Sequence, residues 1–265
     1  MIFIRIGGRA HMIARPLGIS VLSFQIGNSC NYSNLHNKCP INHIPIQENC
    51  QHLSTDKIVK TIEAAQKLGF SGHVNFHFYN EPLLNLDNIV EIINRKKECK
   101  YMVWTNGSTL SREVENNQFL NLFDYVAITC YQTEDIPFYN DIKNHYKNIY
   151  LFESEFDDRL NGYTRNYQNN LSCKRVQYEM PIDYYGNIHL CCFDWKNSYP
   201  IGNIFELSLE EIVNSEKYQS LYSNNRLLDL TNSPDICKNC DKIWVRLPNE
   251  NDGALHLNKK GVAFC

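Results

Sequence analysis

The chain has 265 residues, of which 43% are hydrophobic and 21% are charged, enough for one large domain with a small appendage. A formal net charge of −3 without a stripe of lysine and arginine excludes the electrostatic footprint of a nucleic-acid-binding protein. No transmembrane segment is predicted, and the apolar run of residues 1–4, which Arg5 interrupts, is too short for the core of a signal peptide.

Alternating strands and helices are predicted from residue 21 to about residue 154. Strands are expected where β-branched and aromatic residues gather, at residues 21–26, 74–78, 101–104, 125–129 and 149–153. Helices are expected where apolar residues recur every three or four positions, at residues 54–69, 86–97, 111–122 and 138–146. Ser54 and Thr55 are candidate N-caps for the first helix, and Gly69 ends it. Repeated strand–helix units with apolar strands predict a parallel sheet with right-handed crossovers.

After about residue 171 the pattern changes. Gly186 and Asn187 lie between runs rich in isoleucine, tyrosine and histidine, which predicts a strand–turn–strand hairpin over residues 178–192. A turn at Gly202, a helix over residues 208–221 and a loop that carries Cys237 follow. These features predict a second, smaller unit.

Polar and glycine-rich segments follow the predicted strands of the sheet. They are Gly27-Asn28-Ser29-Cys30-Asn31 after the first strand, Tyr79-Asn80-Glu81-Pro82 after the second, Thr105-Asn106-Gly107 after the third, and Thr129 at the end of the fourth. Because parallel sheets and barrels carry their sites at the carboxyl ends of their strands, these segments predict a site on one rim.

Four cysteines of the C-terminal unit form two pairs with the spacing of a metal site. The pattern is Cys173-x12-Gly186-x4-Cys191 followed, about 45 residues later, by Cys237-x2-Cys240. Eleven cysteines without a secretion signal indicate a reducing compartment rather than a disulfide framework, and thiolates bind iron and zinc strongly. The pattern predicts a four-thiolate site for a soft metal or an iron–sulfur cluster, with a structural zinc ribbon as the alternative.

Taken in order, these segments resemble the motifs of radical S-adenosylmethionine enzymes with a C-terminal auxiliary-cluster domain of the SPASM or twitch type. The resemblance extends over about residues 18–245. It implies an α/β fold, with a partial parallel (β/α)6 TIM-like barrel and a small C-terminal cluster-binding domain built from a β-hairpin and a helix. The expected divisions are an N-terminal extension over 1–17, the barrel over 18–171, the cluster domain over 172–245 and a tail over 246–265.

The resemblance implies which residues bind S-adenosylmethionine. Tyr79-Asn80-Glu81-Pro82 resembles the family's Gly-Gly-Glu-Pro motif, whose backbone and acidic side chain hold the methionine amino group. Thr105-Asn106-Gly107 resembles the strand end near the cofactor. Thr129 stands where the family often has a serine that touches the ribose.

The loop after the first strand departs from the family pattern Cys-x3-Cys-x2-Cys. Position 34 is an asparagine, and the thiols that follow Cys30 are Cys39 and Cys50. A cluster that activates the cofactor needs three protein ligands and one open iron position. The resemblance therefore implies Cys30, Cys39 and Cys50 as ligands, with His36 and His43 as alternatives for the third.

The C-terminal domain also departs from the full SPASM pattern, because position 246 is Arg246 and the later cysteines are missing. Cys173, Cys191, Cys237 and Cys240 suffice for one auxiliary [4Fe–4S] cluster, as in the shortened twitch version. Cys99 and Cys130 are interpreted as structural thiols and Cys192 as a core thiol, whereas Cys265 is a terminal free thiol or, alternatively, an extra ligand. Arg159 and Arg165 are candidates for binding an anionic group, with a solvated surface position as the alternative. Tyr131, Gln132 and His189 are candidates for lining the cavity, with core or surface packing as the alternative.

The implied activity is the reductive cleavage of S-adenosylmethionine to a 5′-deoxyadenosyl radical, which abstracts a hydrogen atom from a substrate. We expect two [4Fe–4S] clusters and an electron donor such as flavodoxin or ferredoxin. The expected substrate is a small polar metabolite, such as an aminocyclitol or a sugar, that is oxidised or epimerised. The alternatives are a maturase that modifies a ribosomal peptide and a non-catalytic binding protein that carries zinc or a cluster. A cytoplasmic location is expected, and Met12 is an alternative start to Met1.

Overall fold

The structure is a computed structural model that describes residues 3–6, 9–12, 17–36, 38–48, 50–156, 173, 175–223 and 234–238. The first two strands, β1 (Phe3–Ile6) and β2 (Arg9–Met12), pair with each other in antiparallel orientation. Across the described ranges, no helix combines the length and the hydrophobicity that a membrane crossing requires.

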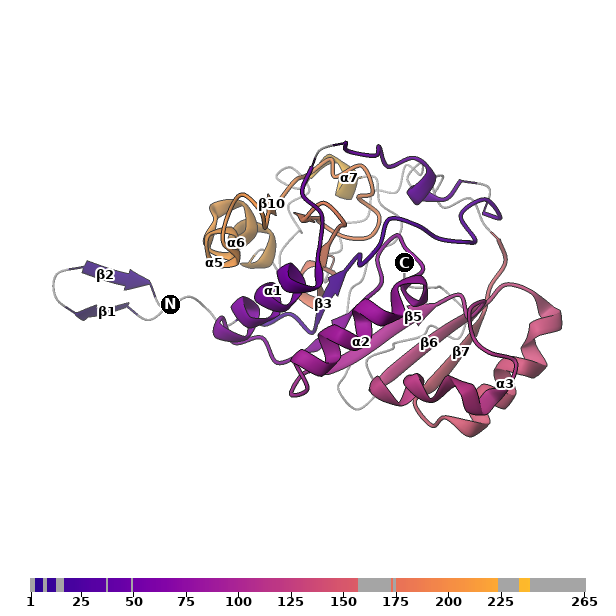
Figure 1. Ribbon diagram of the computed structural model, residues 1–265. Coiled ribbons are helices and arrows are strands. Elements are labelled where there is room, and N and C mark those ends of the chain that lie inside the picture. Colours follow the sequence, from indigo (N-terminus) through magenta and orange to yellow (C-terminus); the bar gives the residue numbers. More distant parts are fainter. Residues whose placement is uncertain are drawn as a thin grey trace.

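An eight-stranded sheet in the order β10-β9-β8-β3-β4-β5-β6-β7 forms the centre of the molecule (Figure 1). Its strands are β3 (Val21–Phe24), β4 (His73–Asn75), β5 (Lys100–Thr105), β6 (Tyr125–Cys130), β7 (Ile149–Glu153), β8 (Glu179–Ile182), β9 (Asn187–Ile188) and β10 (Gly202–Asn203). Neighbours from β8 to β7 pair in parallel, whereas β8–β9 and β9–β10 pair in antiparallel. The predicted parallel sheet is thereby confirmed.

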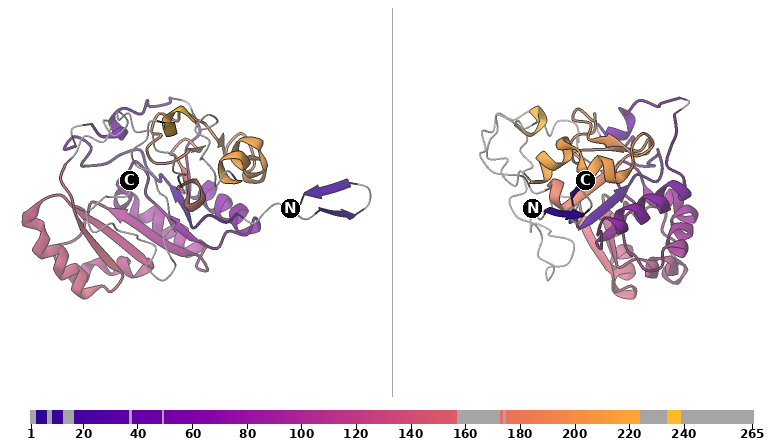
Figure 2. Two further views of the ribbon diagram at one scale, coloured as in Figure 1. Left: turned by 180° about the vertical axis from the view of Figure 1, so that it is seen from behind. Right: turned by 90° about the vertical axis from the view of Figure 1, so that its left-hand side faces the viewer.

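Helices follow the strands and lie on the outside of the sheet (Figures 1 and 2). The α-helices are α1 (Thr55–Lys67), α2 (Leu86–Arg95), α3 (Ile136–His145), α4 (Arg175–Tyr178), α5 (Leu209–Asn214), α6 (Glu216–Ser223) and α7 (Asp235–Lys238). Short 3₁₀ helices are η1 (Pro40–Asn42), η2 (Pro82–Asn85), η3 (Val114–Leu122) and η4 (Thr133–Asp135).

Helix α1 shows how local sequence sets these elements. The Ser54 side chain accepts a hydrogen bond from the Lys57 backbone N–H at 3.2 Å, which satisfies one donor of the first turn. Ile58, Ile62 and Ala65 recur at helical spacing and are fully buried against the sheet. Gly69, with φ of 90°, turns the chain away at the end of the helix. The predicted helix and its N-cap are confirmed.

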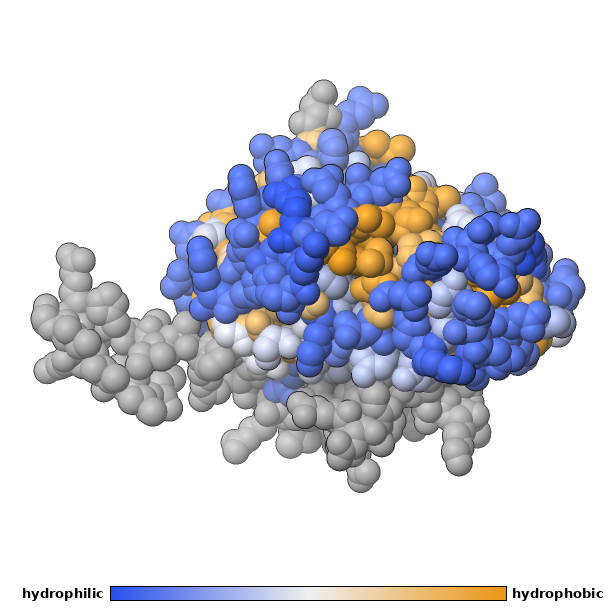
Figure 3. All heavy atoms as spheres, turned by 60° about the horizontal axis from the view of Figure 1, so that its bottom comes forward, coloured by the Kyte–Doolittle hydropathy of each residue, from blue (hydrophilic) through white to orange (hydrophobic). Residues whose placement is uncertain are grey.

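The core lies between the sheet and its helices. Phe24, Phe76, Ile128 and Ile142 are among its fully buried side chains, and each comes from a strand, a strand end or a helix of the β/α units. Burial of one such side chain contributes roughly 1.5–3 kcal/mol relative to exposure. On the face that Figure 3 shows, hydrophilic atoms predominate around a central hydrophobic area.

Two predicted helices differ from the structure. Within the predicted helix over 111–122, only residues 114–122 are helical, and they form the 3₁₀ helix η3 with non-helical backbone at Asn117. The Asn117 amide donates to the Ser111 and Val114 carbonyls and accepts from the Ser111 N–H, so it competes with regular helical bonding. The predicted helix over 208–221 is divided into α5 and α6, because Ser215 adopts an extended conformation with ψ of 145°.

The predicted C-terminal hairpin is continuous with the main sheet. Its first strand, β8, pairs in parallel with β3, and Val21 lies opposite Glu179 in the register. Its second strand, β9, folds back in antiparallel orientation after Gly186, which has φ of 80°. One sheet therefore runs from the β/α units into the C-terminal part, and the domain boundaries given above stay a prediction.

Candidate active site

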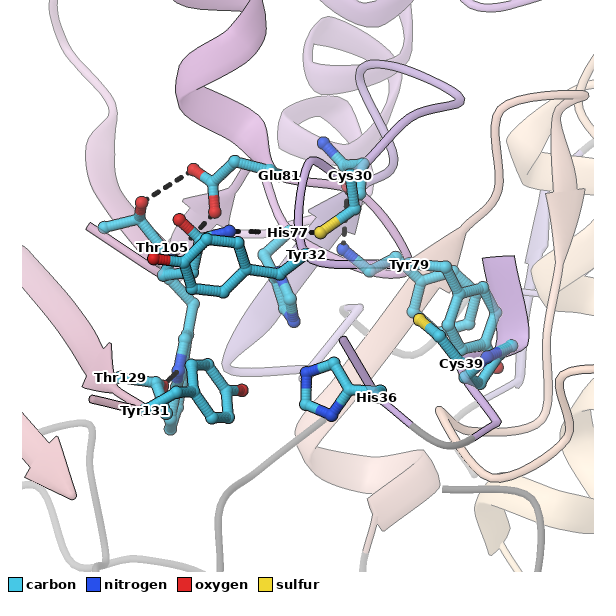
Figure 4. Close-up of a pocket in the computed structure, with 15 residues that line it drawn as sticks. Cys30, Tyr32, His36, Cys39, His77, Tyr79, Glu81, Thr105, Thr129 and Tyr131 are labelled. Atoms are coloured by element: carbon cyan, nitrogen blue, oxygen red, sulfur yellow. Dashed lines mark hydrogen bonds between the residues drawn. The ribbon is translucent and has the colours of Figure 1, made fainter. Parts of the chain in front are cut away.

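An open pocket lies at the carboxyl ends of β3, β4, β5 and β6 (Figure 4). The predicted segments from all four strand ends reach it, as expected for a parallel sheet. Its lining consists of Cys30, Tyr32, His36, Cys39, Pro40, His77, Phe78, Tyr79, Asn80, Glu81, Trp104, Thr105, Asn106, Thr129 and Tyr131. Of the residues predicted to contact the cofactor, Pro82 and Gly107 are not part of this lining.

Hydrogen bonds join the segments that follow the first three strands. The Glu81 backbone N–H donates to the Ser29 carbonyl at 3.0 Å. The Asn106 amide donates to Asn31 Oδ1 at 2.9 Å and approaches Cys30 Sγ at 3.9 Å. These bonds hold the Cys30 loop against the two strand ends beside it, so the loop has a defined position at the pocket.

Glu81 is a buried carboxyl group of the pocket, with 2% of its surface exposed. Its carboxylate accepts hydrogen bonds from Thr105 Oγ1 at 2.6 Å, from the Asn106 N–H at 2.8 Å and from the Leu83 N–H at 3.1 Å. Burial raises the pKa of Glu81 to about 7, although these hydrogen bonds act in the opposite direction. The side chain can therefore hold the Thr105 segment in place and supply a negative charge to a cation.

The backbone around Glu81 and Gly107 explains two positions of the predicted motifs. Glu81 caps η2, and Pro82 occupies the first turn, where its missing N–H costs nothing. Gly107 has φ of 74°, and a Cβ there would lie 2.7 Å from the Tyr139 ring. Only glycine fits this turn without strain.

Thr129 and Tyr79 have partners within the protein. Trp104 Nε1 donates to Thr129 Oγ1 at 2.7 Å, which orients the indole along the pocket wall. The Tyr79 hydroxyl donates to the Cys192 carbonyl at 2.7 Å and so connects the end of β4 to the C-terminal hairpin. Through this bond the pocket is in direct contact with the segment that carries Cys191 and Cys192.

The candidate ligands of the Cys30 loop take different positions. Cys30, Cys39 and His36 line the pocket, and Cys39 and His36 are buried. In Figure 4 the His36 ring stands between Tyr131 and Cys39. Cys50 and His43 are exposed and do not line the pocket.

Four aromatic rings pack together at the edge of the pocket. His36 lies 4.9 Å from Tyr131 and 5.2 Å from Phe156, measured between ring centroids, and the Tyr131 and Phe156 rings stack at 5.0 Å. Tyr32 meets the Tyr131 ring edge-on at 6.0 Å. These ring contacts hold the His36 ring in place at the edge of the pocket.

The C-terminal thiols occupy neighbouring segments. Cys173 precedes α4, Cys191 follows β9 and Cys237 lies in α7, whereas Cys240 lies outside the described residues. Burial raises the pKa of the Cys191 thiol well above its ordinary value, and the negative charges that Cys192 and Cys237 would carry as thiolates raise it further. Binding of a metal would therefore displace a proton from Cys191.

The other predicted residues divide into those that the structure supports and those that it corrects. Tyr131 lines the pocket, but Gln132 does not. His189 is also absent from the lining, because it is buried and its ring nitrogens bond to Asp183 Oδ2 and the Asp194 carbonyl. Cys192 and Cys130 are buried as predicted, and Cys99 is half-buried. Arg159, Arg165 and Cys265 lie outside the described residues.

Sequence reasoning missed five residues of the pocket lining: Tyr32, Pro40, His77, Phe78 and Trp104. His77 and Trp104 belong to the ends of the second and third predicted strands, where the rule for parallel sheets places site residues. Tyr32 lies two positions after Cys30 in the loop, and no local pattern distinguishes it.

The donor types present fit iron–sulfur clusters. Two thiols and two imidazoles line the pocket, and three described thiols with Cys240 would complete a four-thiolate site. Among the described residues, no three histidine, cysteine or acidic side chains converge closely enough to hold a single metal ion.

Comparison with known proteins places the chain among related folds. Residues 173–241 match the SPASM family, an iron–sulfur cluster-binding domain. The chain is 24% identical over 254 residues to the S-adenosyl-L-methionine-dependent 2-deoxy-scyllo-inosamine dehydrogenase of Niallia circulans, and the match covers 89% of this chain and 98% of that protein.

Two solved structures have a similar fold. One is BtrN in complex with AdoMet and 2-DOIA, with a TM-score of 0.65, 21% identity, and coverage of 86% of this chain and 94% of that chain. The other is selenomethionine BtrN in an open conformation, with a TM-score of 0.61, 22% identity, and coverage of 84% and 92%. These likenesses confirm the predicted fold class. The SPASM match lies on the segment predicted to hold an auxiliary cluster.

Proposed function

We propose that this chain, a radical S-adenosylmethionine enzyme with a C-terminal SPASM iron–sulfur domain, oxidises a hydroxyl group of an aminocyclitol to a ketone. The observation that carries the proposal is the convergence of Cys30, Glu81, Thr105 and Thr129, from four successive strand ends, on one pocket. The relative from Niallia circulans is a dehydrogenase of an inosamine. The proposed cofactors are S-adenosylmethionine and two [4Fe–4S] clusters, with flavodoxin or ferredoxin as electron donor.

S-Adenosylmethionine and the cluster, when bound, supply the 5′-deoxyadenosyl radical that removes a hydrogen atom from the substrate carbon. The protein supplies ligands and orientation. Cys30 and Cys39 are the proposed thiolate ligands, and Glu81, which Thr105 holds in place, would bind the cationic amino group of the cofactor. Tyr131 and its aromatic neighbours hold the His36 ring beside the pocket. Oxidation of an alcohol releases two electrons and two protons, and the abstracted hydrogen atom accounts for one of each. We propose that a cluster on the auxiliary thiols would take the second electron, while the second proton would leave the substrate hydroxyl for solvent.

The third ligand of the first cluster is proposed to be His36 rather than Cys50. His36 lines the same pocket as Cys30 and Cys39 and is held by ring contacts, whereas Cys50 is exposed. Imidazole replaces thiolate as a ligand in some iron–sulfur clusters.

Variants at these two positions separate the candidates. In a Cys237→Ala, Cys240→Ala background, which leaves only the first cluster, His36→Phe should lose most of the roughly four irons per chain that one [4Fe–4S] cluster contains. Phenylalanine keeps the ring packing against Tyr131 but cannot bind iron, and His36→Cys should retain the cluster. Cys50→Ala should keep full iron content. Iron and sulfide analysis with absorption spectra measures the result, and iron loss on Cys50→Ala alone would favour the thiol.

Glu81→Gln is expected to weaken S-adenosylmethionine binding by about 10- to 150-fold, the equivalent of roughly 1.5–3 kcal/mol for a hydrogen bond to a charged group. Glutamine keeps the volume of the side chain and an acceptor for Thr105 but removes the charge. Both clusters should remain. Equilibrium binding by calorimetry measures the affinity, and Glu91→Gln, on the exposed face of α2, is the matched control. Unchanged affinity would show that Glu81 does not bind the cofactor.

The raised pKa of Glu81 predicts a pH dependence that the same variant removes. Since the cationic cofactor favours the carboxylate, affinity of the wild type should rise roughly tenfold between pH 6 and pH 8, as Glu81 ionises around its pKa of about 7. The stability of the folded protein should change with pH in the opposite direction to the affinity. The folded protein holds this proton more tightly than the unfolded chain, so the contribution of Glu81 to the free energy of unfolding falls as the pH rises from about 4.5 to about 7. Calorimetric titrations and urea unfolding of both proteins measure these trends.

Direct assay tests the proposed function as a whole. Anaerobically reconstituted protein should convert 2-deoxy-scyllo-inosamine to a ketone in the presence of S-adenosylmethionine and dithionite, with one 5′-deoxyadenosine formed per product. Chromatography with mass detection measures both compounds. 5′-Deoxyadenosine without ketone would point to a different substrate, and protein that binds zinc with negligible iron would mean that the chain is not a radical enzyme.

A further inference from the structure

A buried arginine lies between two of the segments that carry the C-terminal thiols. Arg175 begins α4, two residues after Cys173, and only 7% of its surface is exposed. Arginine is rarely buried, because moving a guanidinium out of water costs several kcal/mol unless its surroundings compensate. Its position therefore calls for a physical explanation.

The guanidinium contacts the segment that follows the ligand Cys191. Its Nη1 donates a hydrogen bond to Cys192 Sγ at 3.6 Å, and its Cζ lies 4.8 Å from the centroid of the Phe193 ring. Arg175 thus reaches from the Cys173 segment to the Cys191 segment. A cluster held by these thiolates would have a fixed positive charge beside it.

A partly buried acidic group, Glu179, also interacts with this positive charge. Burial raises the pKa of Glu179, whereas its hydrogen bond with Ser23 and the charge of Arg175 act to lower it. Glu179 begins β8 and accepts that hydrogen bond from the Ser23 hydroxyl on β3, which in turn accepts from the Asn75 amide at 3.0 Å. Glu179 is thereby tied to the interior of the sheet, whereas the guanidinium contacts Cys192 and Phe193 on the hairpin side.

A neighbouring cation affects the reduction of a thiolate-bound cluster. Reduction adds one electron and makes the cluster more negative by one charge, and nothing else is transferred. Net charge and hydrogen bonds near the sulfurs are among the factors that set cluster potentials. A guanidinium is charged at every accessible pH, so it stabilises the reduced state more than the oxidised state.

We propose that Arg175 sets the potential of the auxiliary cluster, its positive charge making that cluster a better electron acceptor during alcohol oxidation. The inference rests on the proposed function, since it requires a cluster on the C-terminal thiols. It gives a positioning and tuning role to a residue that does not touch the substrate. A merely structural role would instead require the hydrogen bond and ring contact but not the charge.

The test is a redox titration of the cluster followed by electron paramagnetic resonance. A Cys30→Ala, Cys39→Ala parent isolates the auxiliary cluster. Arg175→Met keeps an unbranched stem against Phe193 but removes the charge, and it should lower the equilibrium constant for reduction at least tenfold, which is about 59 mV for a one-electron couple. Arg175→Lys keeps the charge and should shift the potential by less than half as much.

A control removes an arginine that has a similar ring contact elsewhere in the protein. Arg112 lies over the Phe138 ring at 4.4 Å and pairs with Asp135 at 2.6 Å, on the β/α part of the molecule. Arg112→Met should leave the potential unchanged. This variant controls for general effects of losing a cation–π contact and one positive charge.

The results of this titration distinguish a failure of the Arg175 proposal from a failure of the proposed function. An unchanged potential in Arg175→Met, or an equal fall in Arg175→Lys and Arg175→Met, would overturn the role of the charge while leaving the proposed function intact. If Arg175→Met does not retain a cluster, Arg175→Gln serves as the neutral variant, and loss of the cluster from both would assign Arg175 a structural role. A parent protein without an iron–sulfur cluster would overturn both proposals.

Discussion

Cys237→Ala with Cys240→Ala is expected to remove one cluster and nearly all oxidation of the aminocyclitol, while some 5′-deoxyadenosine is still formed. The two thiols belong to the C-terminal segment, whereas the pocket with Cys30, Cys39 and Glu81 is built at the ends of the β3–β6 strands. Loss of the pair should therefore leave the first site loaded. Cleavage of the cofactor would continue without productive oxidation, because the second electron has no acceptor.

The measurements are iron content, 5′-deoxyadenosine and ketone product in the same samples. About four irons per chain should remain of the roughly eight expected for two [4Fe–4S] clusters. Since bound metal contributes to the folding of small domains, circular dichroism and thermal unfolding must accompany the assays. Cys99→Ala, which removes a half-buried thiol outside both predicted ligand sets, is the control and should lose neither iron nor activity. A soluble double mutant with full turnover would mean that the C-terminal thiols have no catalytic role.

Cys30→Ala is expected to abolish 5′-deoxyadenosine formation as well as substrate oxidation. Cys30 lies in a loop held by the Glu81–Ser29 and Asn106–Asn31 hydrogen bonds, and its thiol lines the pocket. With only three protein ligands available to a cluster that keeps one iron open, loss of one thiolate should release it. The auxiliary site has its own thiols and should stay occupied.

Cofactor cleavage should distinguish the Cys30→Ala variant from the C-terminal double mutant. Cys30→Ala should lose about four irons and all cofactor cleavage, whereas the C-terminal double mutant loses a similar amount of iron but keeps some cleavage. Retention of all iron in Cys30→Ala would contradict a cluster in the pocket. Ketone formation by that variant would contradict radical chemistry at this site altogether.

Much of the site could be predicted from the sequence because its residues follow apolar strands directly. The segments with Cys30, Glu81 and Thr105 each come after a run rich in β-branched and aromatic residues, and parallel strands bring their ends to one edge whatever the details of packing. The pocket contains members of all four predicted segments for that reason. Similarly, Ser54 as an N-cap and Gly69 as a helix end are local signals, which the structure of α1 confirms.

Contacts between distant parts of the chain could not be predicted in this way. The Tyr79–Cys192 hydrogen bond joins residues 113 positions apart, and the pairing of β8 with β3 links Glu179 to Val21. The spacing of apolar residues indicates which face of a helix or strand is buried, but it does not indicate which other element packs against that face. The sequence therefore indicated a hairpin next to a sheet, whereas the folded chain makes β8 a strand of that sheet.

The amino-acid sequence by itself determined the types of ligand, the order of the strand-end segments and the elements that carry them, because these depend on residue chemistry and local periodicity. Only the tertiary structure decided that His36 lines the pocket while Cys50 is exposed, and that Arg175 lies against Cys192 and Phe193. Loop conformation and long-range packing place these side chains, and neither leaves a regular pattern in the sequence.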